Sequence, residues 1–460
     1  MIALLSKLLL QERVSILGFG KEGQSSYQYI RKYHPEKKLY ISDININLLT
    51  ENPYLKEDKN IEIIIGEKYL DVLDNTDIVI KSPGVNINRD STAIPWHKIH
   101  TQTSLFLSTF HHQTIGVTGT KGKSTTSTLI YHLLSYSGLH SILLGNIGTP
   151  PFDRIEEIGE QTTVVFEMSA HQLEHLCISP HIAVLLNLFQ EHLDYFGNID
   201  SYYKSKLNIA KYQIEGDIFI YNADEASIQQ YLSNMEIKGE IFHISTIGLP
   251  SNGSSIDKNN NICIYFENKL QWSLTVNPNW NLKGAHNLFN IQAAIIAAFC
   301  RGISPESINR ALTTFKGLDH RLEFVGEYEG IIFYNDSIAT IPEAVIQAVE
   351  TLEIVDTLIL GGFDRGIDYS ILVDFLNNAN IPNLIFTGKA GQRIFQLLKE
   401  NTLTSSQMFI SENYAEIVEI AKKQTNPGRV CLLSPAAASY DAFKNFEERG
   451  NYYKSLIKNT

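Results

Sequence analysis

The chain has few cysteines, a deficit of basic residues and no long hydrophobic run. Its four cysteines are scattered without Cys-x-x-Cys spacing, so neither a disulfide framework nor a cysteine zinc site is indicated. Only 38 lysines and arginines stand against 50 acidic residues, a formal net charge of -12, whereas nucleic-acid binding needs a clustered basic surface. No apolar run approaches the roughly 18 residues that a membrane-spanning helix needs. We therefore expect a cytoplasmic protein that binds neither nucleic acid nor membrane.

The length and the pattern of the chain predict three α/β domains. At 460 residues the chain is too long for one ordinary core, and its 43% hydrophobic and 19% charged residues are typical of globular domains. Three successive blocks alternate short β-type runs, polar or glycine turns and helical patterns, which predicts mainly parallel sheets. The expected domains are residues 1–102, 103–317 and 318–460. The first and last are predicted to be Rossmann-like, and the central one P-loop ATPase-like.

The expected strands follow the β-type runs of each block. They are residues 13–20, 38–43, 61–66 and 77–84 in the first block, residues 114–119, 141–148, 162–170, 181–189 and 216–223 in the second, and residues 330–337, 356–362, 383–388 and 430–438 in the third. Alternating segments at 241–248 and 262–276 predict an antiparallel appendage. Residues 284–302 predict a long helix that Gly302 ends in the left-handed conformation.

A glycine-rich turn follows the first strand of the central block and opens a helical pattern. Glycines let backbone N–H groups approach phosphate oxygens, and the helix N-terminus adds the positive end of its dipole. Lys123 is expected to meet the β- and γ-phosphates, and Ser124 or Thr125 to bind Mg²⁺. An ordinary strand-to-helix turn is the alternative interpretation. The predicted nucleotide-binding residues of the turn are Gly119, Thr120, Lys121, Gly122, Lys123, Ser124 and Thr125.

Oxygen and imidazole side chains follow the next strands of the same block. Glu167 ends one expected strand, and His192 and Asp194 follow another. Because the carboxyl ends of parallel strands meet at one edge of a sheet, we expect these side chains beside the phosphate loop. Such ligands suit a magnesium nucleotide. Singly, each residue is more typical of a solvated or structural side chain.

The first block contains a Gly-x-Gly-x-x-Gly pattern, formed by Gly18, Gly20 and Gly23, and Asp43 ends the following strand. This is the dinucleotide-binding fingerprint. It is compatible with NAD binding or with a tight turn alone.

At this point the whole chain resembles the Mur ligase family, the ATP-dependent enzymes that build the peptide of bacterial peptidoglycan. The collinear segments that carry the resemblance are TGTKGKST, GNIG, EMSAHQLE, NLFQEHLDYFG, SKLNIA, GAHNLFNI, GLDHRLEFV, YNDSIAT, GGFDRG and LSPAAASYDAFKNFEERG. The last segment, with GFGKEGQSS, is most similar to the members that join D-glutamate to UDP-N-acetylmuramoyl-L-alanine. The family resemblance implies a monomer whose partners are three small substrates, namely ATP, this UDP-sugar and glutamate.

The resemblance also implies residue roles. The implied catalytic residues are Lys123, Glu167, His192 and Lys206; two Mg²⁺ ions would be held by Ser124, Glu167, His192 and Lys206, with Lys206 carbamylated by CO₂. Further ATP contacts would be Asn287, Asn290, Arg321 and Asp336. The UDP-substrate would be bound by Gly18, Gly20, Gly23, Asp43, Ile44, Gly84, Asn146 and His192, and glutamate by Thr340, Arg365, Ser439 and Phe446. Without the resemblance, Lys206 would be interpreted as a solvent-facing helix lysine.

Several positions depart from the common pattern of the family. Ile338 and the pair Ile341-Pro342 stand where a lysine and an asparagine are frequent, and His171 stands where Tyr or Phe is usual. L-Glutamate is therefore an alternative substrate. The sequence is also compatible with another ligase of the family or of the folylpolyglutamate type, and with a nucleotide-dependent binding switch without catalysis.

Overall fold

The computed structural model describes residues 10, 13–87, 94–146, 149–277, 280–282, 284–400 and 405–458. Its first compact unit comprises residues 1–277 and 285–313, and its second comprises residues 278–284 and 314–460. The apolar segment at the start of the chain, residue 10 apart, and the last two residues of GNIG lie outside the described residues. Within the described ranges, no helix combines the length and hydropathy needed to span a bilayer.

The first unit begins with a five-stranded parallel sheet in the order β3-β2-β1-β4-β5. Apolar side chains of β1 and β2 pack with Tyr27 and Ile30 of the first long helix in one buried cluster. The four strands predicted in this block are confirmed, and the two-residue strand β5 was not predicted. The elements are β1 (Val14–Leu17), α2 (Lys21–Tyr33), β2 (Leu39–Asp43), α3 (Leu48–Glu51), β3 (Ile61–Ile65), α4 (Val72–Asn75), β4 (Ile78–Lys81) and β5 (Ile99–His100).

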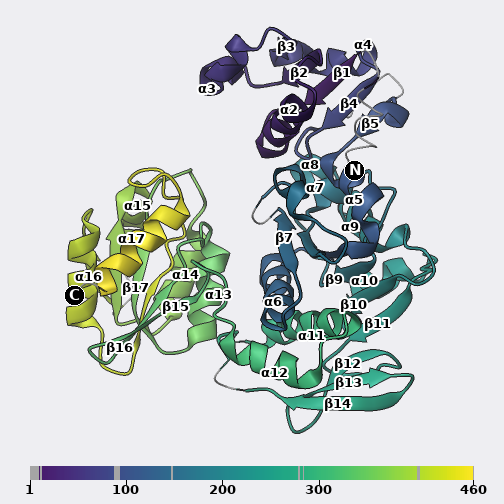
Figure 1. Ribbon diagram of the computed structural model, residues 1–460. Helices are drawn as coiled ribbons and strands as arrows, with labels where there is room; N and C mark the ends of the chain where they lie inside the picture. Colours follow the sequence, from purple (N-terminus) through teal and green to yellow (C-terminus); the bar gives the residue numbers. More distant parts are fainter. Residues whose placement is uncertain are drawn as a thin grey trace. The chain divides into compact units, whose positions relative to one another are not determined.

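The same unit contains a nine-stranded sheet in the order β14-β13-β12-β11-β10-β9-β6-β8-β7. Helices α6 and α11 lie side by side against it (Figure 1). The strands are β6 (Thr114–Thr118), β7 (Ser141–Gly145), β8 (Thr163–Glu167), β9 (Ile182–Leu185), β10 (Ile218–Asn222), β11 (Glu240–Ile244), β12 (Gly253–Ile256), β13 (Asn261–Phe266) and β14 (Lys269–Thr275). The helices are α5 (Gln102–Phe110), α6 (Lys123–Tyr136), α7 (Ala170–Leu173), α8 (Leu193–Phe196), α9 (Ile199–Lys211), α10 (Ala226–Leu232), α11 (Ala285–Cys300) and α12 (Pro305–Thr314).

The predicted antiparallel appendage is partly wrong. Strand β11 pairs with β10 in parallel, and only β12–β13 and β13–β14 are antiparallel pairs of the same sheet. The junction depends on Gly253, whose Cβ would lie 1.9 Å from the carbonyl oxygen of His243. Because a glycine permits this close approach, the ribbon continues the sheet instead of forming a separate layer. The predicted ending of α11 is confirmed, since Gly302 has φ 78°.

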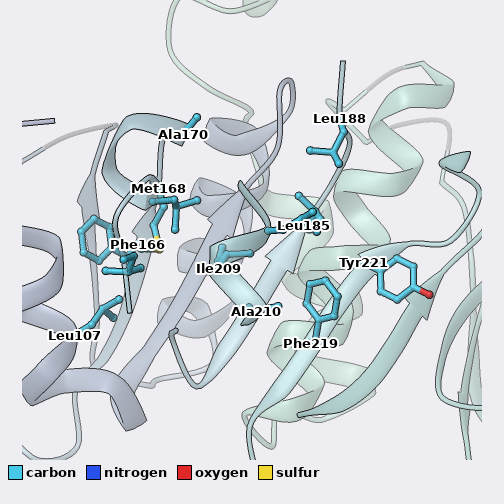
Figure 2. Close-up of a cluster of buried hydrophobic side chains, with 14 of the residues drawn as sticks. Leu107, Phe166, Met168, Ala170, Leu185, Leu188, Ile209, Ala210, Phe219 and Tyr221 are labelled. Atoms are coloured by element: carbon cyan, nitrogen blue, oxygen red, sulfur yellow. The ribbon is translucent and has the colours of Figure 1, made fainter. Parts of the chain in front are cut away.

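Side chains from three parallel strands and one helix form the main core of the nine-stranded sheet. Phe166 of β8, Leu185 of β9 and Phe219 of β10 meet Ile209 and Ala210 of α9 on one face (Figure 2). Burial on both faces explains why these strands are continuous apolar runs in the sequence. The core fixes α9 against β8, whose carboxyl end carries Glu167.

The second unit is a six-stranded sheet in the order β15-β16-β20-β17-β18-β19, parallel except for β15. One buried cluster joins the sheet to α13, α14 and α15, and another joins it to α16 and α17. Thus helices cover both faces, as in a doubly wound sheet. The strands are β15 (Glu323–Tyr328), β16 (Ile331–Asn335), β17 (Val355–Gly361), β18 (Asn383–Thr387), β19 (Gln407–Ile410) and β20 (Val430–Leu433). The helices are α13 (Pro342–Leu352), α14 (Ser370–Asn378), α15 (Gly388–Glu400), α16 (Tyr414–Gln424) and α17 (Phe446–Lys458).

Candidate active site

The phosphate loop lies between the carboxyl end of β6 and the start of α6. Gly119 has φ 155° and Gly122 has φ 84°, values that other residues rarely adopt. A Cβ on Gly122 would in addition lie 2.4 Å from Oδ1 of Asn290. The backbone of the loop therefore requires glycine at both positions.

Polar contacts from the segment after β9 fix the loop. Asn187 Oδ1 accepts from Lys121 N at 2.8 Å, and Asn187 Nδ2 donates to the Lys121 carbonyl at 3.0 Å. Lys123 Nζ donates to the carbonyl oxygens of Gly119 and Thr120, at 3.0 and 2.9 Å. The Lys123 ammonium group thus lies over its own loop, where phosphate oxygens bind in loops of this kind.

Glu167 ends β8 and lies opposite Val117 of β6 in the sheet register. Its side chain is fully buried; Oε1 accepts from Asn146 Nδ2 at 2.6 Å, and Oε2 has no hydrogen-bond partner among the described residues. A buried carboxylate oxygen without a donor is costly, and Mg²⁺ binds such oxygens. The donor set at this edge of the sheet therefore fits a magnesium ion.

Lys206 lies on α9 and is only 1% exposed. Its Nζ donates to the Gly119 carbonyl at 2.8 Å and lies 4.8 Å from the ring centre of Tyr202. Burial, and after it the positive charge of Lys123, holds the pKa of Lys206 well below its usual range. The interpretation of Lys206 as a solvent-facing lysine is wrong, because α9 packs against the sheet with this side chain directed at the phosphate loop.

Lys123, Asn146 and Lys206 line one cavity of about 360 Å³. His192, in the left-handed conformation at φ 55°, lies there with its ring centre 5.1 Å from that of His171. Burial, with the neighbouring His192, lowers the pKa of His171 to about 4, so His171 is neutral near pH 7. Asp194 is exposed on α8 and does not line the cavity. The lining residues are Pro83, Gly84, Lys123, Asn146, Ser169, Ala170, His171, Glu191, His192, Tyr202 and Lys206.

The two asparagines of α11 lie beside the phosphate loop. Asn290 Nδ2 donates to Asn287 Oδ1 at 2.8 Å, and Asn290 Oδ1 accepts from the Thr126 hydroxyl of α6 at 3.2 Å. Asn290 is buried. Since Asn290 also packs on Gly122, α11 positions the loop from the side of α6. Ser124 and Thr125 occupy the first turn of α6.

The glycine loop of the first sheet is closed by the carboxylate of Asp43. Asp43 Oδ2 accepts from Phe19 N at 2.6 Å, and Gly18 has φ 85°. A Cβ on Gly23 would lie 2.1 Å from the Gly18 carbonyl oxygen, whereas Gly20 has open space around it. Ile44 is 65% exposed directly after Asp43. The pattern is therefore a real tight loop with an exposed apolar side chain next to it.

Tyr195 connects the segment after β4 with the central sheet. Its hydroxyl donates to Glu174 Oε2 at 2.9 Å and lies 3.2 Å from the Val85 carbonyl. Nearby, burial raises the pKa of Glu22 to about 7 and lowers that of Lys81 to about 8. Tyr195, Glu22 and Lys81 were not predicted from the sequence. The sequence signals that could have indicated two of them are the position of Glu22 inside the glycine motif and that of Lys81 at the end of a strand.

In the second unit, Asp336 joins the ends of β16 and β20. Its carboxylate accepts from Ser434 Oγ at 2.7 Å and from Leu322 N at 3.1 Å. Complete burial raises its pKa to about 7. Arg321 is exposed, and its positive charge acts to lower the pKa of Asp336, against the effect of burial. The structure thus brings together the two predicted ATP-contact residues of this unit.

Of the predicted glutamate-binding residues, Thr340, Arg365 and Ser439 lie on loops after strands of the third sheet, and Phe446 begins α17. Arg365 Nη2 lies 3.5 Å from the Thr340 carbonyl oxygen. Ser439 is buried, and the Phe446 ring centre lies 6.0 Å from that of His320.

Arg449, which was not predicted from the sequence, ties these loops together. Its guanidinium group is buried and donates to the Ser337 carbonyl at 2.8 Å, the Ala437 carbonyl at 3.0 Å and the Ala438 carbonyl at 3.1 Å. Burial lowers the pKa of Arg449. Arg449 therefore connects the loops after β16 and β20, which carry Thr340 and Ser439.

Substitution of Arg449 by methionine is expected to destabilise the second unit by about 3 kcal/mol or more, because three buried carbonyl groups each lose a hydrogen-bond donor. Urea unfolding followed by hydrogen exchange in β20 and α17 measures the change. The exposed Arg429, directly before β20, provides the control, and its methionine variant should stay within about 0.5 kcal/mol of the parent. Equal stability of the two variants would contradict the structural role.

Comparisons with known proteins agree with this architecture. The model of the Mur ligase middle domain matches residues 117–298. The chain is 32% identical to the UDP-N-acetylmuramoylalanine--D-glutamate ligase of Clostridium acetobutylicum over 463 residues, covering 98% of both chains. It is 34% identical to the protein of that name from Clostridium kluyveri, covering 88% of this chain and 87% of that one. The solved MurF ligase of Thermotoga maritima in complex with ADP matches with a TM-score of 0.58 at 17% identity, covering 98% and 99%.

A full-length relative at this level of identity, together with the phosphate loop and the three sheets, defines the class of the protein. The chain belongs to the Mur ligase family. The predicted α/β fold with three mainly parallel sheets is confirmed by the structure and by the solved Mur ligases of similar fold.

Proposed function

We propose that this chain is an ATP-dependent ligase that joins D-glutamate to UDP-N-acetylmuramoyl-L-alanine and releases ADP and phosphate. The observation that carries the proposal is the cavity in which Lys123, His192 and Lys206 meet beside the buried carboxylate of Glu167. The names of the relatives, which are 30–34% identical to this chain, support the two substrates. The reaction belongs to cytoplasmic synthesis of the peptidoglycan precursor, and we propose a monomer.

The chemistry explains why the site needs a nucleotide. A carboxylate does not condense with an amine in water without activation. In the proposed reaction the γ-phosphoryl group of ATP moves to the alanine carboxylate and gives an acyl phosphate. The glutamate amine attacks its carbonyl carbon, and the tetrahedral intermediate loses a proton and expels phosphate. Lys123 neutralises charge on the transferred group, which is the main demand of phosphoryl transfer.

Two Mg²⁺ ions, when bound, supply further charge neutralisation for the phosphates. We assign the first to Ser124 and Glu167, and the partnerless oxygen of Glu167 supports this. We assign the second to His192 and a carbamylated Lys206. Carbamylation forms an N–C bond between the neutral amine and CO₂ and releases one proton, so the burial of Lys206 beside Lys123 supports it.

We assign the binding of the UDP-substrate to residues of the first unit. We propose that Gly18, Gly20 and Gly23 hold the diphosphate of the UDP-sugar, with Asp43 and Ile44 near the uracil and Gly84 and Asn146 toward the sugar and peptide. The exposed position of Ile44 and the position of Gly84 in the cavity lining support this assignment. NAD titration without a binding signal would agree with it. We also propose that the domain boundaries lie after residues 102 and 317.

In the C-terminal unit, we propose that glutamate is bound by Thr340, Arg365, Ser439 and Phe446, and that Arg321 and Asp336 contact ATP. The other proposed ATP contacts, Asn287 and Asn290, belong to α11 of the first unit. A substrate with two carboxylates needs cationic and hydroxyl donors, which Arg365 and Thr340 provide. L-Glutamate is the second candidate substrate, because Ile338 and Ile341-Pro342 depart from the common family pattern in the same loop.

The test is phosphate release by the full-length protein with ATP, UDP-N-acetylmuramoyl-L-alanine and each glutamate isomer. Release should require all three substrates and should be faster with D-glutamate. Faster release with L-glutamate would show that L-glutamate is the substrate, and the proposed ligase activity would still hold. If no combination of substrates gave phosphate release, the proposed reaction would be contradicted, and a nucleotide-dependent switch would be favoured.

A further inference from the structure

A second group of metal-binding side chains lies at the opposite edge of the nine-stranded sheet. His111 and His112 belong to the short helix η4 (His111–Gln113) immediately before β6. His181 precedes β9, and Asp217 precedes β10. Because β6, β9 and β10 are neighbouring parallel strands, their amino ends meet at one edge. The phosphate loop follows the other end of β6.

The ligand atoms of the four side chains converge. One nitrogen or oxygen atom from each of His111, His112, His181 and Asp217 lies within 4.8 Å of the others. His111 Nε2 is 3.0 Å and His181 Nδ1 is 2.9 Å from the same oxygen, Oδ1 of Asp217. Neighbouring ligand atoms of a tetrahedral zinc ion are about 3.3 Å apart, given metal–nitrogen distances of about 2.0 Å. The cluster is therefore near the size of an occupied zinc site.

The hydrogen bonds of His111 assign its proton. His111 Nδ1 lies 2.6 Å from the Ser179 carbonyl oxygen, which can only accept, so Nδ1 carries the hydrogen. In a neutral imidazole Nε2 then presents a lone pair, and this lone pair faces the carboxylate oxygen of Asp217. The lone pairs of His111 Nε2 and Asp217 Oδ1, 3.0 Å apart, would repel each other without a positive group between them. A metal ion bound to both atoms would remove this repulsion. A second proton on His111 would also remove it.

The surroundings favour the metal ion. Metal-bound histidines commonly donate their other N–H group to a backbone carbonyl, as His111 does to Ser179. Asp217 Oδ2 accepts from Ile214 N at 2.8 Å, which fixes the buried carboxylate. His112 is exposed and the His181 side chain is 25% exposed. An ion can therefore enter from solvent and meet ligands that are already oriented.

We propose that His111, His112, His181 and Asp217 form a binding site for a late first-row divalent cation, best matched by Zn²⁺, separate from the catalytic cavity. Three imidazoles and one carboxylate suit zinc, whereas magnesium prefers oxygen ligands. The ion would cross-link the amino ends of three adjacent strands. It would stabilise the first unit without taking part in the ligase reaction.

Calorimetric titration of the metal-free, full-length protein with Zn²⁺, without nucleotide, tests the proposal. Co²⁺ is the second probe, because its visible absorption reports tetrahedral coordination. The wild-type protein should bind one Zn²⁺ tightly and give the tetrahedral Co²⁺ band. The double variant His112→Ala/His181→Gln should raise the Zn²⁺ Kd at least about tenfold and lose the band. Its Mg²⁺-ATP-dependent activity should equal that of the wild type.

Two single variants serve as controls. His97→Ala removes an exposed histidine elsewhere in the same unit and should keep the tight site. His192→Ala removes the histidine of the catalytic cavity and should keep it too. Absence of tight Zn²⁺ binding by the wild type, its retention in the double variant, or its loss in His192→Ala would each overturn the proposal. In the first case the cluster is an ion pair between protonated His111 and Asp217.

Discussion

Replacement of Lys123 by alanine is expected to lower the rate of acyl-phosphate formation at least about 1000-fold. Lys123 lies at the first position of α6, and its ammonium group lies 3.0 Å from the Gly119 carbonyl and 2.9 Å from that of Thr120. The cavity that it lines also contains His192 and Lys206. Its positive charge is therefore located at the phosphate loop itself. Rapid-quench measurement of ADP formation with the UDP-substrate but without glutamate follows this first step.

Lys121 provides the control in the same loop. Its side chain is 57% exposed and pairs only with Glu191, at 3.0 Å, among the described ion pairs. The variant Lys121→Ala should therefore lose far less of the rate than Lys123→Ala. Near-normal ATP-dependent phosphate release by Lys123→Ala would refute the assignment of the loop.

Replacement of Lys206 by alanine is expected to lower activity at least about 100-fold, and wild-type activity is expected to fall when CO₂ is removed and to return with bicarbonate. The lowered pKa of Lys206, caused by burial and then by Lys123, favours the neutral amine, which is the form that can add CO₂. The carbamate is an anion beside the phosphate loop. The unmodified lysine side chain, in contrast, is a neutral amine or a cation. With ¹³C-labelled bicarbonate, the wild type should show a carbamate carbon signal in NMR spectra that Lys206→Ala lacks.

Lys204, on the same helix, is the matched control. It is 66% exposed and pairs with Asp200 one turn earlier at 2.7 Å. The variant Lys204→Ala should keep wild-type activity and the same response to CO₂. Wild-type activity that is indifferent to CO₂, in a protein without the carbamate signal, would contradict the assignment of the second metal ligand.

The central strands and the phosphate loop could be predicted because their signals are local. Buried parallel strands such as β8 and β9 are continuous apolar runs, and the glycines of the loop have conformations that few other residues adopt. The edge strands β15 and β19 were missed, because they are only partly buried and lack such runs. The position of Glu167 beside the loop followed from the strand order expected of a parallel sheet.

Residues that depend on packing between distant segments could not be predicted from local patterns. The burial of Lys206 is decided by the packing of α9 on the sheet, and its hydrogen bond to Gly119 spans 87 positions. Arg449 binds Ser337 across 112 positions of the chain. The protonation of Glu22 and Lys81 likewise depends on burial at the contact between segments. For such residues the sequence supplies the type of side chain, and the fold supplies its environment.

The most direct measurement of the central claim is the fate of ¹⁸O in the alanine carboxylate of the UDP-substrate. If the cavity beside Lys123, Glu167 and Lys206 transfers the γ-phosphoryl group to that carboxylate, one ¹⁸O atom must appear in each phosphate released during amide formation. Mass spectrometry of the phosphate, with labelled substrate, ATP and D-glutamate, counts it. Labelled phosphate is the predicted result, and unlabelled phosphate with normal product formation would contradict the account.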